Sequence, residues 1–166
     1  MNAAHLHLVL NHIPVIGIPL AAILLLYGMG QKNEGIKKAG VLAMVLLAMI
    51  TVPSYLSGEP AEGVIENIAG VSKLSIEKHE EAAISAIIGT LILGLISLAG
   101  LLLFRSPKNL PGWLLATLLS FAILTTGMMA WTATLGGQIR HTELKSDNTN
   151  IKNNIGTESQ NEKDDD

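Results

Sequence analysis

Four long runs of apolar residues alternate with short polar segments along the chain. The runs cover about 8–29, 39–57, 82–104 and 113–135. A helix that rises 1.5 Å per residue needs roughly 20 apolar residues to cross about 30 Å of hydrocarbon, and each run is close to that length. Backbone polar groups in lipid must be paired within their own segment, so the pattern predicts four membrane-spanning helices.

Turn-forming residues separate the runs. Gly28 and Gly30 precede the first connection, Gly58 and Pro60 follow the second run, and the segment 106–112 reads SPKNLPG. The first run lacks a basic stretch before it, so we expect it to be retained as a helix rather than removed as a signal peptide. The predicted fold is an all-α integral membrane protein, a bundle of four transmembrane helices over residues 1–141.

The segment 142–166 differs from the rest of the chain in composition. It holds seven acidic residues and three lysines among Asn, Ser, Thr and Gly. A segment with so few apolar residues cannot bury enough surface to fold alone. We therefore expect a disordered acidic C-terminal tail after the bundle.

The charged residues of the connections predict the orientation of the bundle. Basic residues dominate the connections 30–38 and 105–112, whereas the connection 58–81 carries six glutamates against two lysines. Basic connections remain on the cytoplasmic side of a membrane. We expect a multi-pass protein of the bacterial inner membrane with both termini in the periplasm. The basic residues that decide this are Lys32, Lys37, Lys38, Arg105 and Lys108.

The amino-acid composition excludes several classes of function. The chain has no cysteine, which excludes disulfides, thiolate metal sites and covalently attached haem. Its net charge of −3 gives no basic surface for nucleic acid. No nucleotide-binding loop, HExxH motif or serine-nucleophile motif is present, so we expect at most a subunit of an oxidoreductase complex.

The five histidines all fall at the predicted outer ends of the helices. They are His5, His7, His12, His79 and His141. Histidine at the edge of a membrane span indicates a functional site, and neutral imidazole is a common ligand of metals and of haem iron. On a regular helix His5 and His12 share a face, whereas His7 and His12 point in different directions.

Small residues follow His79 along the third predicted helix. Ala82, Ala83, Ala86 and Gly89 lie on the same face as this histidine. Such a stripe allows two helices to approach closely, or it leaves room for a flat macrocycle. The sequence leaves both interpretations open.

Three short motifs resemble a known family. The string HLVLNHIP, which contains His7, His12 and Pro14, is similar to the opening motif of a family of small four-helix bacterial membrane proteins of unknown function. The third helix of that family also begins with a histidine, here His79. Its fourth helix ends in Gly-Gly followed by a histidine, here Gly136, Gly137 and His141. The resemblance covers roughly residues 5–143 and implies a b-type haem.

We therefore expect an electron-transfer subunit of a respiratory or other redox complex, with one or two haems b near the outer face. The axial ligands of the haem iron are expected among His12, His79, His141 and His7. His12 and His79 are the preferred pair. Arg140 is expected to pair with a haem propionate. The expected partners are membrane lipid, other subunits of the complex, and quinol or a periplasmic cytochrome. Three outer glutamates are candidate acceptors of quinol protons: Glu59, Glu62 and Glu66.

Two alternative functions belong to classes other than electron transfer. One is a copper, zinc or iron site without haem, built from His5, His7, His12, His79 and the glutamates. The other is a cofactor-free assembly subunit of a membrane complex. A bundle with short connections predicts that His12 lies within about 15 Å of His79 and of His141, because sequential helices become neighbours.

Overall fold

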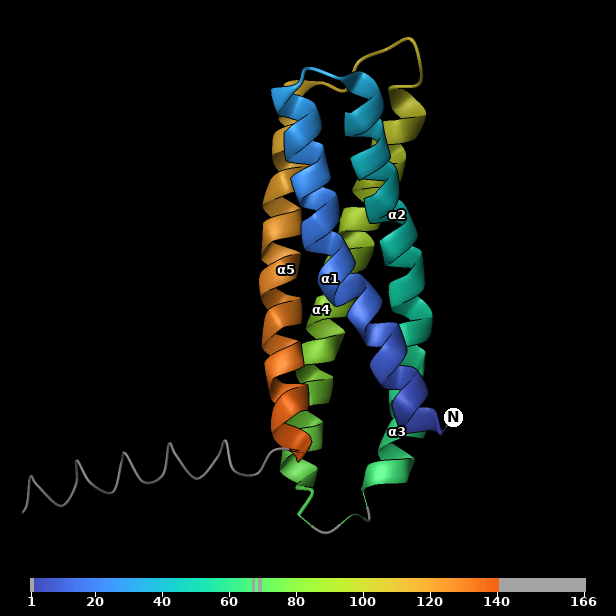
Figure 1. Ribbon diagram of the computed structural model, residues 1–166, viewed down its shortest axis with the longest axis vertical. Helices are drawn as coiled ribbons and strands as arrows, with labels where there is room; N and C mark the ends of the chain where they lie inside the picture. Colours follow the sequence, from blue (N-terminus) through green and yellow to red (C-terminus); the bar gives the residue numbers. More distant parts are fainter. Residues whose placement is uncertain (1, 67, 69, 141–166) are drawn as a thin grey trace, which may run out of the picture.

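The computed structural model describes residues 2–66, 68 and 70–140, and within these residues the regular structure is entirely helical (Figure 1). Helices α1, α2, α4 and α5 are long, and each runs antiparallel to the long helix before it in the chain. Helix α3 is short. Their bounds are Ala3–Gly30 for α1, Glu34–Leu56 for α2, Gly58–Ile65 for α3, Lys73–Leu103 for α4 and Gly112–Arg140 for α5. The predicted tail from 142 to 166 lies outside the described residues.

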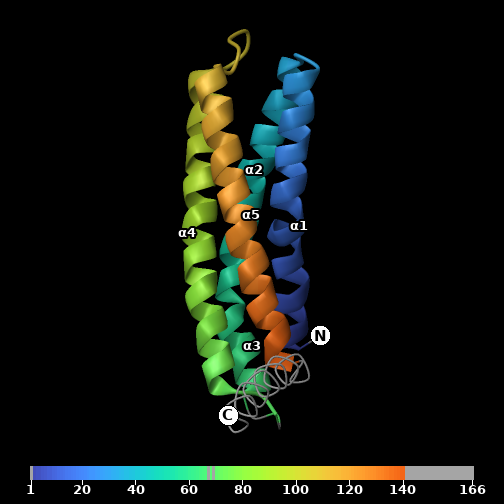
Figure 2. The same ribbon diagram turned by 90° about the vertical axis from the view of Figure 1, so that its left-hand side faces the viewer.

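Among the described residues, the four long helices form a closed bundle. Helix α1 packs against α2 and α5, and α4 packs against α2 and α5, so that each long helix has two neighbours (Figures 1 and 2). The connections 31–33 and 104–111 lie together at one end, which we call the basic end. Helix α3 and residues 70–72 lie at the other, which we call the acidic end.

In the described part of the chain, four helices are long and apolar enough to cross a membrane. This confirms the prediction of four such helices and fits a multi-pass membrane protein. Three of them begin five or more residues before the predicted runs, α2 among them at Glu34. Helix α1 starts at Ala3, because Asn2 caps it by accepting a hydrogen bond from the His5 N–H at 2.9 Å. Helix α4 starts at Lys73, nine residues before the predicted run.

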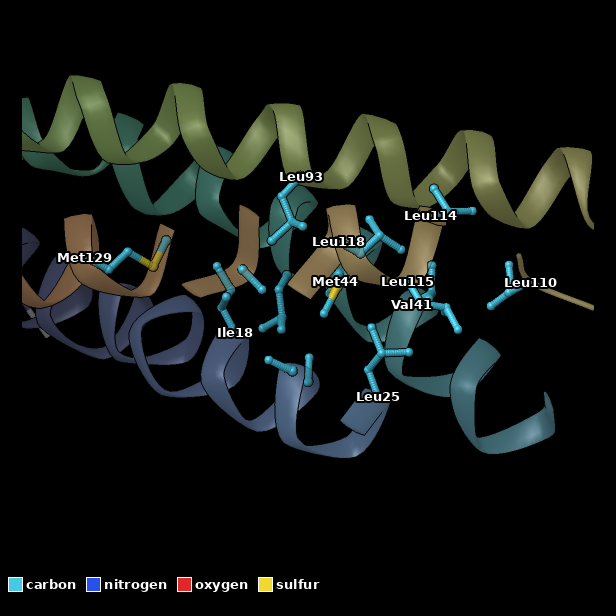
Figure 3. Close-up of a cluster of buried hydrophobic side chains, with 14 of the residues drawn as sticks. Ile18, Leu25, Val41, Met44, Leu93, Leu110, Leu114, Leu115, Leu118 and Met129 are labelled. Carbon is cyan, nitrogen blue, oxygen red and sulfur yellow. The ribbon is translucent and has the colours of Figure 1, made fainter. Parts of the chain in front are cut away.

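The exposed and buried side chains are arranged as expected for a protein in lipid. Large aliphatic side chains are exposed along the bundle, for example Leu95 at 66% and Ile123 at 70%. The interior combines aliphatic residues (Figure 3) with small hydroxyl residues such as Thr51 and Thr90. Their hydroxyls donate to the carbonyls of Leu47 and Ala86 one turn back. Helices in lipid associate through small residues and satisfied polar groups, and Thr51 and Thr90 follow this rule. Thr125 differs, because its buried hydroxyl has no hydrogen-bond partner among the described residues.

Glycines set the closest approaches between helices. A Cβ on Gly40 of α2 would lie 2.9 Å from the backbone nitrogen of Leu25 on α1. A Cβ on Gly94 of α4 would collide with the Cβ of Ala48 on α2. Both glycines are buried, so the small-residue pattern serves helix packing at these depths.

Helix α1 contains two prolines in its interior, Pro14 and Pro19. Proline has no backbone N–H and its ring crowds the preceding turn, so it bends a helix. Figure 1 shows α1 running obliquely near its N-terminus and more nearly along the bundle beyond its middle. The N-terminal part of α1 consequently reaches α3 at the acidic end.

Four exposed aromatic residues mark two levels along the bundle. Tyr27 of α1 and Trp113 of α5 lie near the basic end, and Tyr55 of α2 and Trp131 of α5 lie toward the acidic end. Trp113 and Trp131 are 18 residues apart, which corresponds to about 27 Å along a helix. Tyrosine and tryptophan collect at the two membrane–water interfaces, so this spacing matches the thickness of the hydrocarbon layer.

Candidate functional site

Two histidines from different helices meet at the acidic end. The ring centroids of His7 on α1 and His79 on α4 are 6.4 Å apart, and the ring planes are perpendicular. Both side chains are partly buried. His7 reaches this position because α1 begins at Ala3, and His79 because α4 begins at Lys73. The early starts of the two helices therefore assemble the pair.

The ring of His7 is held by the end of α2. Its Nδ1 lies 3.1 Å from the carbonyl oxygen of Ser54 and 2.9 Å from Oγ of Ser57. The Ser57 hydroxyl donates its own proton to the Ser54 carbonyl at 2.6 Å. A carbonyl only accepts, so the proton of the imidazole is on Nδ1. In the neutral ring, Nε2 then carries the lone pair.

The ring of His79 is held in the same manner by α5. Its Nδ1 donates to the carbonyl oxygen of Thr132 at 2.9 Å, which again leaves the lone pair on Nε2. Gly136 provides the space, because a Cβ at this position would lie 3.0 Å from Cε1 of His79 and 3.1 Å from Nδ1. Within the described residues, Nε2 of neither His7 nor His79 has a hydrogen-bond partner.

This anchoring has a recognised chemical consequence. Histidines that bind metals usually donate their second ring N–H to a backbone carbonyl or a carboxylate, which fixes the tautomer and the ring orientation. Both His7 and His79 do so through Nδ1. Each therefore presents a neutral nitrogen with a free lone pair, which is the form of histidine that binds iron.

The other predicted ligands lie elsewhere. His12 and His5 are exposed on α1, and Nδ1 of His12 is bonded to the carbonyl of Leu8 on the same helix. The structure therefore brings His7, rather than His12, beside His79. His141 lies outside the described residues. Arg140 closes α5, and its side chain is not described.

The described residues include no group of three or more His, Cys, Asp or Glu side chains that could hold a metal ion. The copper, zinc or iron site that we considered as an alternative therefore finds no such group among them. Of the outer glutamates, Glu59 and Glu66 are exposed and Glu62 on α3 is partly buried. Their expected role as proton acceptors stays a prediction.

Sequence reasoning missed the residues that anchor the pair. Ser54, Ser57 and Thr132 carried no motif, since Ser54 and Thr132 contribute only backbone carbonyls. Gly136 belonged to a motif that we noted, but its role beside His79 depends on how α4 and α5 align. That alignment was not readable from the chain.

Comparisons of the chain with protein families, with characterised proteins and with solved structures give no match.

Proposed function

We propose that this protein is a membrane-embedded electron-transfer subunit that holds haem b at its acidic end, with His7 and His79 as the axial ligands. The observation that carries the proposal is the pairing of two neutral imidazoles from facing helices, each anchored through Nδ1. At 6.4 Å between ring centroids, the two side chains are close enough for both to hold one such group.

The donor set fits such a group. Two imidazoles form a closed coordination shell, and haem iron held in this way moves electrons rather than binding oxygen. Ala82 and Ala83 follow His79 on α4 and are only partly buried, so small side chains leave surface beside the histidine. Helical bundles commonly build cofactor sites from side chains on facing helices.

The position at the acidic end determines the proposed partners. Basic residues occupy the opposite end, which supports an orientation with the acidic end and the N-terminus in the periplasm of a bacterial cell. The site would then exchange electrons with quinol in the bilayer or with a cytochrome at the outer surface. The chain acts as one subunit of a redox complex.

The test is an optical spectrum of the full chain purified in detergent, oxidised and then reduced with dithionite. We expect a Soret band and a b-type reduced spectrum that both His7→Ala and His79→Ala abolish. His12→Ala is the matched control, because it removes an exposed histidine from the same helix and is expected to keep the spectrum. A colourless wild-type protein that does not take up added haem would overturn the proposal and favour a cofactor-free assembly subunit. Loss of the spectrum in His12→Ala and His79→Ala, but not in His7→Ala, would restore the pair expected from the sequence.

A further inference from the structure

Three positively charged residues meet at the connection between α4 and α5, at the basic end of the bundle (Figure 1). The backbone N–H of Lys108 donates to the carbonyl oxygen of Arg105 at 2.7 Å, which closes a four-residue turn. The Cα atoms at the two ends of such a turn lie within about 7 Å of each other. The ammonium group of Lys38 on α2 donates to the carbonyl oxygen of Lys108 at 2.8 Å. One turn therefore collects cations from two distant parts of the chain.

The nearby acidic residue does not neutralise this cluster. Glu34 is the only acidic residue between positions 30 and 38 or between 104 and 112. Its carboxylate is occupied by Lys37 at 2.6 Å and by the backbone N–H of Leu110 at 3.1 Å. Arg105 and Lys108 are exposed, and neither has an ion-pair partner among the described residues. The turn thus carries an uncompensated positive charge.

Apolar side chains flank the turn on the side of the membrane. Leu102 and Leu103 are 52% and 67% exposed in the last turn of α4, and Trp113 is 66% exposed at the start of α5. Both helices are long and apolar enough to cross a membrane. Tryptophan collects at the membrane–water interface, so Trp113 places the turn at the level of the lipid headgroups. Within a few residues the surface changes from apolar to cationic, as a phospholipid changes from acyl chain to phosphate.

We propose that the turn 105–108 binds an anionic phospholipid, whose phosphate is contacted by Arg105 and Lys108 and whose acyl chains lie against the ends of α4 and α5. Charge complementarity selects this occupant, because cations at a membrane surface attract anionic lipids in preference to zwitterionic ones. The guanidinium of an arginine also matches the oxygens of a phosphate in a two-pronged hydrogen bond. A soluble phosphate would use the same cations but would leave the exposed apolar side chains without a role. The inference goes beyond the proposed function and does not depend on haem.

The experiment is a lipid titration of the full chain in detergent, with bound lipid counted by native mass spectrometry. The probe is phosphatidylglycerol, and phosphatidylcholine with the same acyl chains is the reference. We expect tighter binding of phosphatidylglycerol by the wild type. Arg105→Gln and Lys108→Gln should each weaken it roughly fivefold, the effect of one cation near an anionic headgroup, and should leave phosphatidylcholine unchanged. Both side chains are exposed, so neither change removes core packing.

Lys32→Gln is the matched control. It removes an exposed cation from the other connection of the same end, and this residue has no ion pair or side-chain hydrogen bond to the turn. The control is expected to bind phosphatidylglycerol as the wild type does. If it lost as much affinity as the Arg105 and Lys108 variants, the preference would follow total charge, and the site at the turn would be overturned. Equal binding of the two lipids by the wild type would also overturn it.

Glycerol phosphate separates a lipid from a soluble anion, because it offers the same phosphate chemistry without acyl chains. At constant ionic strength, it should displace phosphatidylglycerol only at concentrations far above the Kd of the lipid. Displacement at concentrations similar to that Kd would show that the acyl chains contribute nothing. The turn would then be assigned to a soluble phosphate, and the lipid proposal would fail.

Discussion

Gly136 of α5 lies directly against the imidazole of His79 on α4. A Cβ at position 136 would come within 3.0 Å of Cε1 and 3.1 Å of Nδ1. The same imidazole donates to the carbonyl of Thr132, one turn earlier on α5. The absence of a side chain at one position thus allows the hydrogen bond at another, and this bond fixes the nitrogen that faces the candidate site.

Gly136→Ala is therefore expected to displace His79 and to break its bond to the Thr132 carbonyl. Loss of such an outer hydrogen bond weakens metal binding by roughly 10- to 100-fold, so haem titration of the variant should give a correspondingly higher Kd. Gly137→Ala is a closely matched control. It makes the same change one residue later, where a Cβ meets nothing within 4 Å. Equal haem affinity in both variants would show that Gly136 does not position the histidine.

Gly94→Ala should destabilise the bundle without touching the histidines. The added methyl group would collide with Ala48 on α2, and overpacking of this kind costs about 1 to 3 kcal/mol. The expected result is a lower thermal midpoint, measured by circular dichroism in detergent. Gly127→Ala adds the same methyl group where nothing lies within 4 Å, and it should leave the midpoint unchanged or raise it. A midpoint for Gly94→Ala at or above that of the wild type would contradict the close approach of α2 and α4.

Glu34 ties the two connections of the basic end together. Its carboxylate accepts from Lys37 at 2.6 Å and from the backbone N–H of Leu110 at 3.1 Å. Lys38 adds a second link by donating to the carbonyl of Lys108. Glu34→Ala leaves the Leu110 N–H without its acceptor, which should cost about 1 to 2 kcal/mol in thermal unfolding.

Glu34→Gln separates the charge of this residue from its role as an acceptor. The amide oxygen can still accept from Leu110, and only the ion pair with Lys37 is lost. A partly exposed ion pair contributes about 0 to 1 kcal/mol, so this variant should lie close to the wild type. If the two variants were equally destabilised, the hydrogen bond to Leu110 would not be the stabilising contact.

The length of the apolar runs was enough to predict the four long helices, because a membrane imposes one length and one secondary structure on each run. The same reasoning could not place the start of α1. The capping bond from Asn2 adds five residues before the apolar run and brings His7 into the helix. Depth within a run says nothing about which face a side chain occupies, so the sequence could not show that His12 is exposed while His7 lies beside His79.

The pairing of His7 with His79 depends on contacts that lie far apart in sequence. His7 is anchored by residues 47 and 50 positions away, and His79 by a carbonyl 53 positions away. Hydrogen bonds of this kind follow from the packing of whole helices. A single sequence identifies the candidate histidines, and the fold selects which two meet.

The depth of the candidate site is tested by the two tryptophans. Single-tryptophan proteins, made as Trp113→Phe and Trp131→Phe, should each be quenched most strongly by lipids brominated close to the headgroup. Both residues are expected at roughly 14 Å from the bilayer centre, half of the 18-residue spacing between them. Trp131 precedes Thr132, whose carbonyl holds His79, so its depth also reports that of the histidine pair. Strongest quenching of Trp131 by bromines near the bilayer centre would place the pair inside the hydrocarbon instead.

The same tryptophans test the proposed orientation. Lys32, Lys38 and Arg105 lie in or beside the connections of the basic end, and Trp113 begins α5 there. Positive connections remain in the cytoplasm because they are not readily translocated. In sealed right-side-out vesicles, a membrane-impermeant quencher added outside should therefore reduce the fluorescence of Trp131 and spare that of Trp113. Inverted vesicles should give the opposite result, and detergent should expose both residues, which controls for differences in local accessibility. Quenching of Trp113 from outside would place the basic end in the periplasm and the histidine pair on the cytoplasmic side. In that case the electron-transfer partner would be a cytoplasmic protein rather than a periplasmic cytochrome.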